Sequence, residues 1–329
     1  MVHYNSILDL VGNTPLIKLK NASEITGCNI LGKAEFLNPG QSIKDRAALN
    51  MIINAEKKTN SNKLIVEGTG GNTGIGLTVI GNALGYKTLI VMPENQSIEK
   101  INLLKHLGAK VLLTKQLPFS DPNNYIQLAK KIAEEKNAIW TNQFDNLANR
   151  EAHIKTTSQE IWKQTEGKVD AFICSVGTGG TLAGNYIGLK EKNKNIQIYC
   201  ADPYGSGMYS WIRKGKPKSS LSSITEGIGQ SRITKNLTGI NFDGALKVHD
   251  KTALKIIYQL IYQEGLFLGP TSGINIGGAI KLAKKIGPNK TIVTVLCDGA
   301  DRYTSKIFNK AFLTENNLDY KELNNKYAY

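Results

Sequence analysis

Residues 171–181 read Ala-Phe-Ile-Cys-Ser-Val-Gly-Thr-Gly-Gly-Thr and continue into a stretch that resembles an amphipathic helix. A short apolar run, a glycine-rich turn and then a helix are typical of one parallel βα unit. Backbone N–H groups that such a turn exposes at the start of a helix can bind an anion. The stretch therefore predicts a parallel sheet with an anion-binding loop at the carboxyl end of a strand.

The same alternation of short apolar runs and longer amphipathic stretches extends over most of the chain. Two of the returns from helix to strand, Leu84–Lys87 and Leu107–Lys110, each place a glycine where a helix commonly ends in a left-handed residue. We therefore expect an α/β fold built from open, twisted, mostly parallel sheets flanked by helices. Further strands are expected at residues 63–67, 88–92, 110–114, 196–201 and 291–297.

Length and composition favour a soluble globular protein with two lobes. A chain of 329 residues is long for one domain, and no linker rich in proline or serine divides it, so we expect two closely packed lobes with a cleft between them. No signal peptide and no run of about 20 apolar residues is present, which favours the cytoplasm over secretion or a membrane.

Charge and cysteine content exclude some functions. The net charge of +14 comes from lysines spread along helical faces, without a basic block interleaved with aromatic residues, so we expect no nucleic-acid partner. Four cysteines without a C-x-x-C pair are interpreted as buried free thiols. The four histidines lack the spacing of metal ligands, so no metal is expected, and they are interpreted as structural or exposed: His3, His106, His153 and His249.

Two more glycine-rich loops follow or precede expected elements, at residues 67–74 and 269–273. Glycine turns alone are a weak signal, since a tight turn explains them about as well as a ligand does. The hydroxyls of Thr271 and Ser272 can also serve as helix caps.

The loop at 177–181 fails the dinucleotide fingerprint because Leu182 stands where glycine is required. A nicotinamide oxidoreductase is therefore disfavoured.

A single lysine stands out in the stretch 38–46, Asn-Pro-Gly-Gln-Ser-Ile-Lys-Asp-Arg, which follows the strand-like residues 34–37. A lone lysine is usually a surface residue, but Lys44 falls in the first turn of an expected helix, the end that disfavours positive charge. This position favours a functional amine that attacks an aldehyde over a solvated surface charge.

Several motifs in register resemble the cysteine synthase and cystathionine β-synthase family, the fold-type II pyridoxal-phosphate enzymes. They are residues 11–16 (VGNTPL), 38–46, 142–144 (NQF), 156–162 and 177–181. The resemblance implies a smaller, mobile domain at 36–148 that closes over the substrate. It also implies a larger domain, formed by 1–35 and 149–329, that binds pyridoxal 5'-phosphate.

At matching positions the resemblance implies a set of site residues. Lys44 would carry the cofactor as a Schiff base, Asn72 would contact its ring hydroxyl, and Thr271, where the family usually has serine, its ring nitrogen. The cofactor phosphate would be held by Gly177, Thr178, Gly179, Gly180 and Thr181. The substrate would be bound by Thr69, Gly70, Gly71, Asn72, Thr73 and Gln143, with Gly227 and Gly229 in a mobile segment.

The implied reaction is a β-replacement that forms L-cysteine from O-acetyl-L-serine, or a similar activated serine, and sulfide through an aminoacrylate, with Lys44 as both anchor and base. Where the family commonly has proline and serine, this chain has Gly68 and Gly70, so one hydroxyl contact is absent; Gln41 also replaces a small residue. These departures leave open a cystathionine β-synthase, a cysteine desulfhydrase or an O-phosphoserine-dependent synthase.

The resemblance also implies a homodimer and a serine acetyltransferase partner that inserts its carboxyl-terminal tail into the cleft. A different class, a silent scaffold protein that kept the fold, is disfavoured because Lys44 and both anion loops are present.

Overall fold

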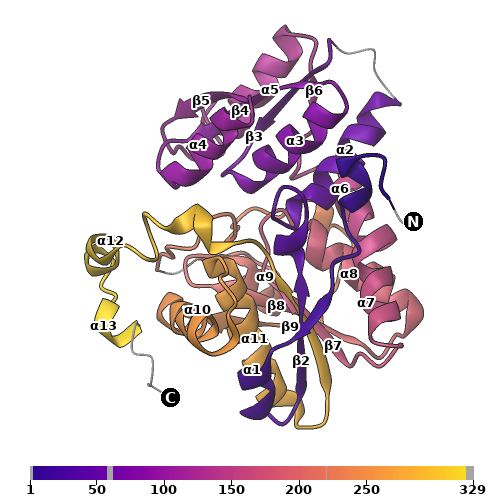
Figure 1. The fold of residues 1–329 in the computed structure, drawn as a ribbon, viewed down its shortest axis with the longest axis vertical. Helices are drawn as coiled ribbons and strands as arrows, with labels where there is room; N and C mark the ends of the chain where they lie inside the picture. The colour runs from indigo at the N-terminus through magenta and orange to yellow at the C-terminus, as the bar shows by residue number, and fades with distance from the viewer. Residues whose placement is uncertain (1–2, 58–61, 220, 324–329) are drawn as a thin grey trace.

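Two sheets flanked by helices divide the protein into two lobes (Figure 1). The computed structural model describes residues 3–57, 62–219 and 221–323. In Figure 1 the upper lobe carries β3 to β6, and the lower lobe carries the larger sheet. The predicted α/β class with two mostly parallel sheets is confirmed.

The smaller sheet is fully parallel and is covered on both faces. Helix α5 (Tyr125–Glu135) packs on one face, where Ala129 and Ala133 contact Val66 and Val91. On the other face lie α2 (Lys44–Glu56), α3 (Asn72–Ala83) and α4 (Ile98–His106). The strands, in spatial order, are β5 (Lys110–Thr114), β4 (Lys87–Pro93), β3 (Leu64–Gly68) and β6 (Ile139–Trp140).

The larger sheet has one antiparallel edge strand, β1, and is otherwise parallel. Its two faces carry separate apolar cores, one around Ile257 and Leu282 and the other around Phe172 and Leu182. The strands, in spatial order, are β1 (Leu16–Lys18), β2 (Asn29–Ala34), β10 (Thr291–Leu296), β7 (Ala171–Cys174), β8 (Gln197–Pro203) and β9 (Gly244–Val248).

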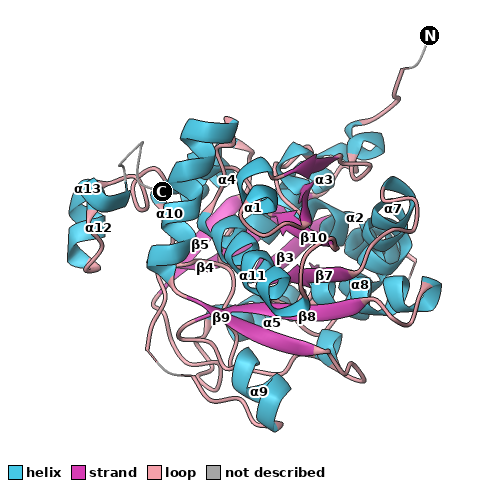
Figure 2. Cartoon of the chain, turned by 90° about the horizontal axis from the view of Figure 1, so that it is seen from below, coloured by secondary structure: helices cyan, strands magenta, loops and turns pink. Residues whose placement is uncertain are grey.

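Helices cover both faces of the larger sheet, as the view from below shows (Figure 2). The first core is closed by α10 and α11, and the second by α8 with α7 and α9. The helices are α1 (Lys20–Glu24), α6 (Leu147–Ala152), α7 (Ser158–Gln164), α8 (Gly180–Lys192), α9 (Met208–Lys214), α10 (Asp250–Glu264), α11 (Pro270–Ile286), α12 (Lys310–Glu315) and α13 (Tyr320–Leu323).

Each strand expected from the alternating pattern is present within two residues of its predicted ends. Gly85 and Gly108 have φ angles of +75° and +90°, so the predicted left-handed helix ends are confirmed. The strand-like interpretation of residues 34–37 is wrong: β2 ends at Ala34, and Glu35–Leu37 form a 3₁₀ turn that directs the Glu35 carboxylate inward onto Arg46 at 2.7 Å.

The thiols are free, as expected: Cys28, Cys174 and Cys200 are buried and Cys297 is half-buried. The described part of the carboxyl-terminal tail forms the end of α12 and α13 at the edge of the lower lobe, and residues 324–329 lie outside the described chain (Figure 1). Within the described residues, no helix combines the length and apolarity that crossing a bilayer requires.

Candidate active site

A cleft of about 700 Å³ is lined by residues of both lobes. Its walls are loops that follow the carboxyl ends of β3, β4, β7 and β10, the edge at which open α/β sheets bind ligands. Of the residues expected at the site, Gly180 alone is not part of the wall. The others line it: Lys44, Thr69, Gly70, Gly71, Asn72, Thr73, Gln143, Gly177, Thr178, Gly179, Thr181, Gly227, Gly229 and Thr271.

Lys44 is the first residue of α2, and its side chain lines the cleft. The next two side chains are buried elsewhere: Asp45 accepts a hydrogen bond from the Gly40 N–H, and Arg46 binds Glu35. Burial raises the pKa of Asp45 to about 7. Among the described residues, no carboxylate lies within 4.0 Å of the Lys44 ammonium, so its amine is available to a ligand.

The glycine loop after β7 forms a cup of backbone groups. Gly179 caps α8 with a φ angle of +88°, and a Cβ atom on Gly177 would lie 2.3 Å from the Gly227 carbonyl oxygen. Gly229 donates a hydrogen bond to the Val176 carbonyl at 3.1 Å. The segment around Gly227 therefore packs directly against the cup, and only glycine at 177 permits that approach.

Two side chains behind the cup contact the hydroxyl groups of Thr178 and Thr181. Asn149 donates to Thr178 Oγ1 at 2.8 Å, and His153 Nε2 lies 3.2 Å from Thr181 Oγ1. Burial, together with the positive charge of Arg46, lowers the pKa of His153 to about 3, so the imidazole is neutral. The structural interpretation of His153 is thus correct, although its place behind the cup could not be predicted from sequence.

The loop after β3 is held by its own hydrogen bonds. Thr69 Oγ1 accepts from the Gly71 N–H at 3.1 Å, and the Thr73 hydroxyl donates to Gln143 Oε1 at 2.6 Å. Gln143 Nε2 donates to the Gly68 carbonyl at 3.0 Å. The loop thus keeps its shape through side chains that were expected to bind substrate.

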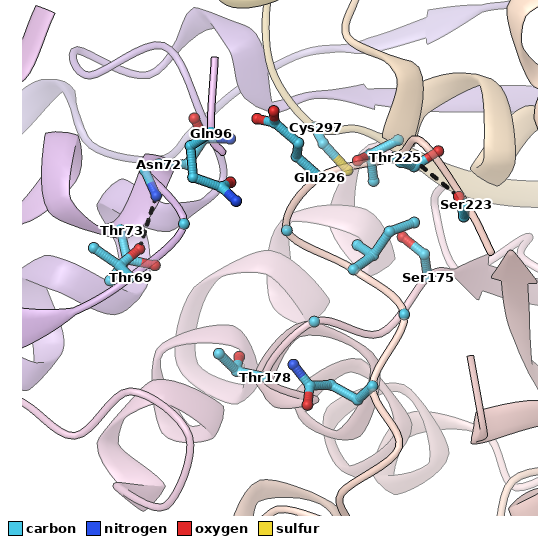
Figure 3. Close-up of a pocket in the computed structure, with 18 of the residues that line it drawn as sticks. Thr69, Asn72, Thr73, Gln96, Ser175, Thr178, Ser223, Thr225, Glu226 and Cys297 are labelled. Atoms are coloured by element: carbon cyan, nitrogen blue, oxygen red, sulfur yellow. Dashed lines mark hydrogen bonds between the residues drawn. The ribbon is translucent and has the colours of Figure 1, made fainter. Parts of the chain in front are cut away.

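Asn72 begins α3 and connects the two lobes. Its amide donates to Asp298 Oδ2 at 2.6 Å and accepts from Arg302 at 2.7 Å, and both partners follow β10 of the larger lobe. Figure 3 shows Asn72 beside Thr69 and Thr73 on one wall of the cleft.

At the start of α11 the two hydroxyls have different surroundings. Ser272 Oγ accepts from the Cys297 N–H at 2.9 Å and is fully buried, whereas Thr271 lines the cleft. Neither residue is the cap, because the helix begins at Pro270 after Gly269. Thr271 is therefore the hydroxyl that a ligand can reach.

The cleft wall also contains residues that were not predicted from sequence, among them Gln96, Glu226, Cys297 and Asp298. Gln96 and Asp298 follow the carboxyl ends of β4 and β10, and this position was the one signal that could have identified them. Burial raises the pKa of Cys297 to about 12, so its sulfur is a thiol rather than a nucleophilic thiolate.

A reactive amine, a backbone anion cup and a neutral hydroxyl share one cleft, and residues 7–298 match a family model described as pyridoxal-phosphate dependent enzyme. The chain belongs to this family. A relative from Emericella nidulans, cysteine synthase 1, is 49% identical over 95% of this chain and 87% of its own length.

Two solved structures have the same fold. A hydrogen sulfide-producing enzyme from Fusobacterium nucleatum has a TM-score of 0.83 at 35% identity, covering 92% of this chain and 98% of its own. An O-acetylserine dependent cystathionine beta-synthase from Helicobacter pylori has a TM-score of 0.84 at 32% identity, covering 93% and 99%.

The donor set of the cleft fits the cofactor of this family. A phosphate group matches a cup of N–H groups at the amino end of a helix of 13 residues. An aldehyde matches the accessible amine of Lys44, and an aromatic ring nitrogen matches the free hydroxyl of Thr271.

Proposed function

We propose that this chain binds pyridoxal 5'-phosphate and forms L-cysteine by replacing the β-substituent of O-acetyl-L-serine, or a similar activated serine, with sulfide. The observation that carries this proposal is the position of Lys44, an amine without a carboxylate partner in the described chain, in the same cleft as a backbone anion cup. The 49% identity to a protein named cysteine synthase 1 supports the choice of reaction.

The cofactor would be held at three points. Lys44 would bind its aldehyde carbon, residues 177–181 would hold its phosphate, and Thr271 would face its ring nitrogen. When bound, the cofactor supplies the electron sink that stabilises negative charge at the substrate Cα. A neutral hydroxyl at the ring nitrogen leaves that nitrogen unprotonated, which moderates the sink and suits β-replacement over transamination.

The protein groups bind the substrate and move its proton. The loop at 69–73 lies at the amino end of α3, where N–H groups attract the substrate carboxylate. The Lys44 amine lies where it would take a proton from the substrate Cα and return one to the cofactor-bound product side, acting as the base of the reaction. The segment 227–229 packs on the cup and would exclude water from the reacting carbon.

Borohydride reduction followed by peptide mapping tests the anchor. We expect a reduced cofactor adduct on Lys44 and on no other lysine, and we expect Lys44→Ala to lose both the adduct and cysteine formation. The exposed Lys87→Ala is the matched control and should keep both. An adduct elsewhere, or none, would overturn the proposal.

A substrate panel separates this reaction from the alternatives on the same fold. The protein should consume O-acetylserine with sulfide faster than O-phosphoserine, serine with homocysteine, or cysteine alone. Faster turnover of serine with homocysteine would indicate a cystathionine β-synthase, and release of sulfide from cysteine would indicate a desulfhydrase.

The assembly and the location of the protein are part of the same proposal. We expect a cytoplasmic homodimer of twice 36.0 kDa that binds the carboxyl-terminal tail of a serine acetyltransferase in its cleft. Light scattering measures the mass of the assembly. Competition between the acetyltransferase tail peptide and O-acetylserine measures whether the tail binds in the cleft.

A further inference from the structure

A glutamine side chain occupies the space beside Gly70, where the substrate loop lacks a side chain of its own. Gln96 lies in the loop between β4 and α4 and lines the cleft. A Cβ atom on Gly70 would lie 3.0 Å from Gln96 Oε1. Figure 3 shows Gln96 next to Asn72, with Glu226 on the facing side of the cleft.

The amide of Gln96 is only partly used by the protein. Its Oε1 is buried and accepts no hydrogen bond from the described chain. Its Nε2 donates to Asn95 Oδ1 at 3.1 Å, and Asn95 in turn donates to Gln116. Buried polar atoms are rarely left without a partner, so an orphan on a cleft wall points to a ligand.

The side-chain amides of Gln116, Asn95 and Gln96 form a hydrogen-bonded row. This row can present either a hydrogen-bond donor or an acceptor to the cleft. A carboxamide turned over by 180° exchanges its carbonyl and NH₂ positions with little change in shape. If Gln116, Asn95 and Gln96 turn together, each hydrogen bond of the row is kept with donor and acceptor exchanged. Gln96 then directs an NH₂ group, instead of a carbonyl, at the space above Gly70.

Two other side chains of the substrate loop already make hydrogen bonds within the protein. Thr69 Oγ1 accepts from Gly71, and the Thr73 hydroxyl donates to Gln143. An ionised carboxylate accepts about four hydrogen bonds, more than one turn of backbone N–H groups supplies. The Thr69 hydroxyl can still donate one hydrogen bond, and Gln96 is a neighbouring side chain whose buried oxygen has no partner in the described chain.

We propose that Gln96 is a substrate-binding residue whose NH₂ group donates a hydrogen bond to the α-carboxylate of the amino-acid substrate above Gly70. The proposal rests on the proposed function to the extent that the ligand is an α-amino acid. The Gln96 amide, which lies in a neighbouring loop, thus makes the hydrogen bond that a hydroxyl at position 70 would make.

Binding of L-alanine to the holoenzyme tests this contact without turnover, because alanine carries the α-carboxylate but no leaving group. Its Kd is read from the change in visible absorbance of the bound cofactor. Gln96→Leu should weaken L-alanine and raise the KM of O-acetylserine by similar factors, about tenfold each, since a hydrogen bond to a charged group is lost. Cofactor content should stay unchanged.

Two further variants sharpen the result. Gln127→Leu changes a half-buried glutamine on α5, away from the cleft wall, and should alter neither constant. Adding Gly70→Ser to Gln96→Leu places a hydroxyl where the amide was and should recover most of the affinity for L-alanine.

Two outcomes would overturn the proposal. If Gln96→Leu weakens O-acetylserine but not L-alanine, the amide contacts the β-substituent instead; if neither constant changes, Gln96 does not contact the substrate. Failure of the proposed function is distinguishable: a holoenzyme that makes no cysteine can still lose L-alanine affinity on Gln96→Leu.

Discussion

At the scale of single residues, Gly177 is required by the contact between the anion cup and the segment at 227–229. Gly177→Ala would place a Cβ atom 2.3 Å from the Gly227 carbonyl, and backbone cannot swing aside as a side chain can. We expect the cup and the segment to separate, with cofactor affinity reduced at least tenfold and unfolding free energy lowered by about 1–3 kcal/mol. Cofactor titration and urea unfolding measure both.

Gly81→Ala is the matched control. Gly81 lies inside α3, and its Cβ atom would lie 3.3 Å or more from the side chains of Ile65, Tyr86 and Thr88. Alanine also favours a helix more than glycine does. The variant should bind cofactor normally and be as stable as the parent. If Gly177→Ala behaved in the same way, the close approach of Gly227 would not matter for cofactor binding.

Glu67 gives the stability of the protein a specific dependence on pH. Burial raises its pKa to about 7, although the Thr141 hydroxyl donates to it. The folded state therefore binds this proton more tightly than the unfolded chain does, and stability falls as pH rises from about 4.5 to about 7. Glu67→Gln should remove a loss on the order of 1–3 kcal/mol.

Urea unfolding at several pH values measures this effect. The difference in unfolding free energy between Glu67→Gln and the parent should grow in favour of the variant from pH 4.5 to 7 and then level off. A constant difference would mean that the pKa of Glu67 is the same in the folded and unfolded protein.

At the scale of elements, one buried arginine joins four segments. Arg46 of α2 binds Glu35 after β2 at 2.7 Å and Glu160 of α7 at 2.6 Å, and it reaches Thr14 at 3.2 Å. Burial alone would raise the pKa of Glu35, but the guanidinium lowers it to about 2. Because α2 begins with Lys44, this cluster also positions the proposed cofactor anchor.

Arg46→Met should therefore be destabilising by about 3–5 kcal/mol at pH 7, because it leaves the Glu35 carboxylate buried without its cation. The double variant Arg46→Met/Glu35→Gln removes the uncompensated charge and should lose less. Chemical denaturation of both variants gives the comparison. Equal losses would show that packing of the arginine stem, not its charge, matters.

The alternating pattern predicted the strands that are long and apolar, since burial on both faces of a parallel sheet leaves a continuous hydrophobic run. It did not find β1, which has three residues, β2, whose run is interrupted by Gly32 and Lys33, β6, which has two residues, or β9, where Gly244 begins a strand with two half-buried positions. Residues 34–37 were misassigned because the inward turn of Glu35 depends on Arg46, a partner that local sequence does not reveal.

The candidate site was predicted to the extent that its residues lie in continuous motifs. Lys44, the cup and the loop at 69–73 each follow a strand, and the fold brings them to one cleft. Gln96, Glu226 and Asp298 were missed because their importance depends on neighbours far away in the sequence: Gly70, Lys100 and Asn72. Pairings of this kind become visible only in three dimensions.

At the scale of the whole molecule, the rim of the cleft is where polar contacts join the two sheets. Asn72 binds Asp298, Glu99 of α4 accepts from Ser305 at 2.8 Å, and Lys100 of α4 contacts Glu226 at 2.5 Å. Glu226 precedes Gly227, so this last ion pair connects the smaller lobe to the segment that covers the cup. The proposed domains, 36–148 and the remainder, would move about these contacts.

Glu226→Gln should loosen that connection more than a surface substitution would. The Lys100 side chain is 1% exposed, and burial lowers its pKa, so a Lys100 without its carboxylate partner is costly. We expect the unfolding free energy at pH 7 to fall by about 3 kcal/mol, and amide hydrogen exchange to quicken at residues 221–230. The deficit should shrink as pH rises, because the neutral amine is cheaper to bury.

Glu322→Gln is the matched control, since its carboxylate pairs with Lys251 on the surface, where water screens the charges and the pair contributes little to stability. If both variants lost equal stability, or if exchange at 221–230 stayed slow in Glu226→Gln, the ion pair would not hold the segment. A deficit that stayed constant with pH would show that Lys100 keeps its proton through another partner, with Asp298 the nearest candidate by charge.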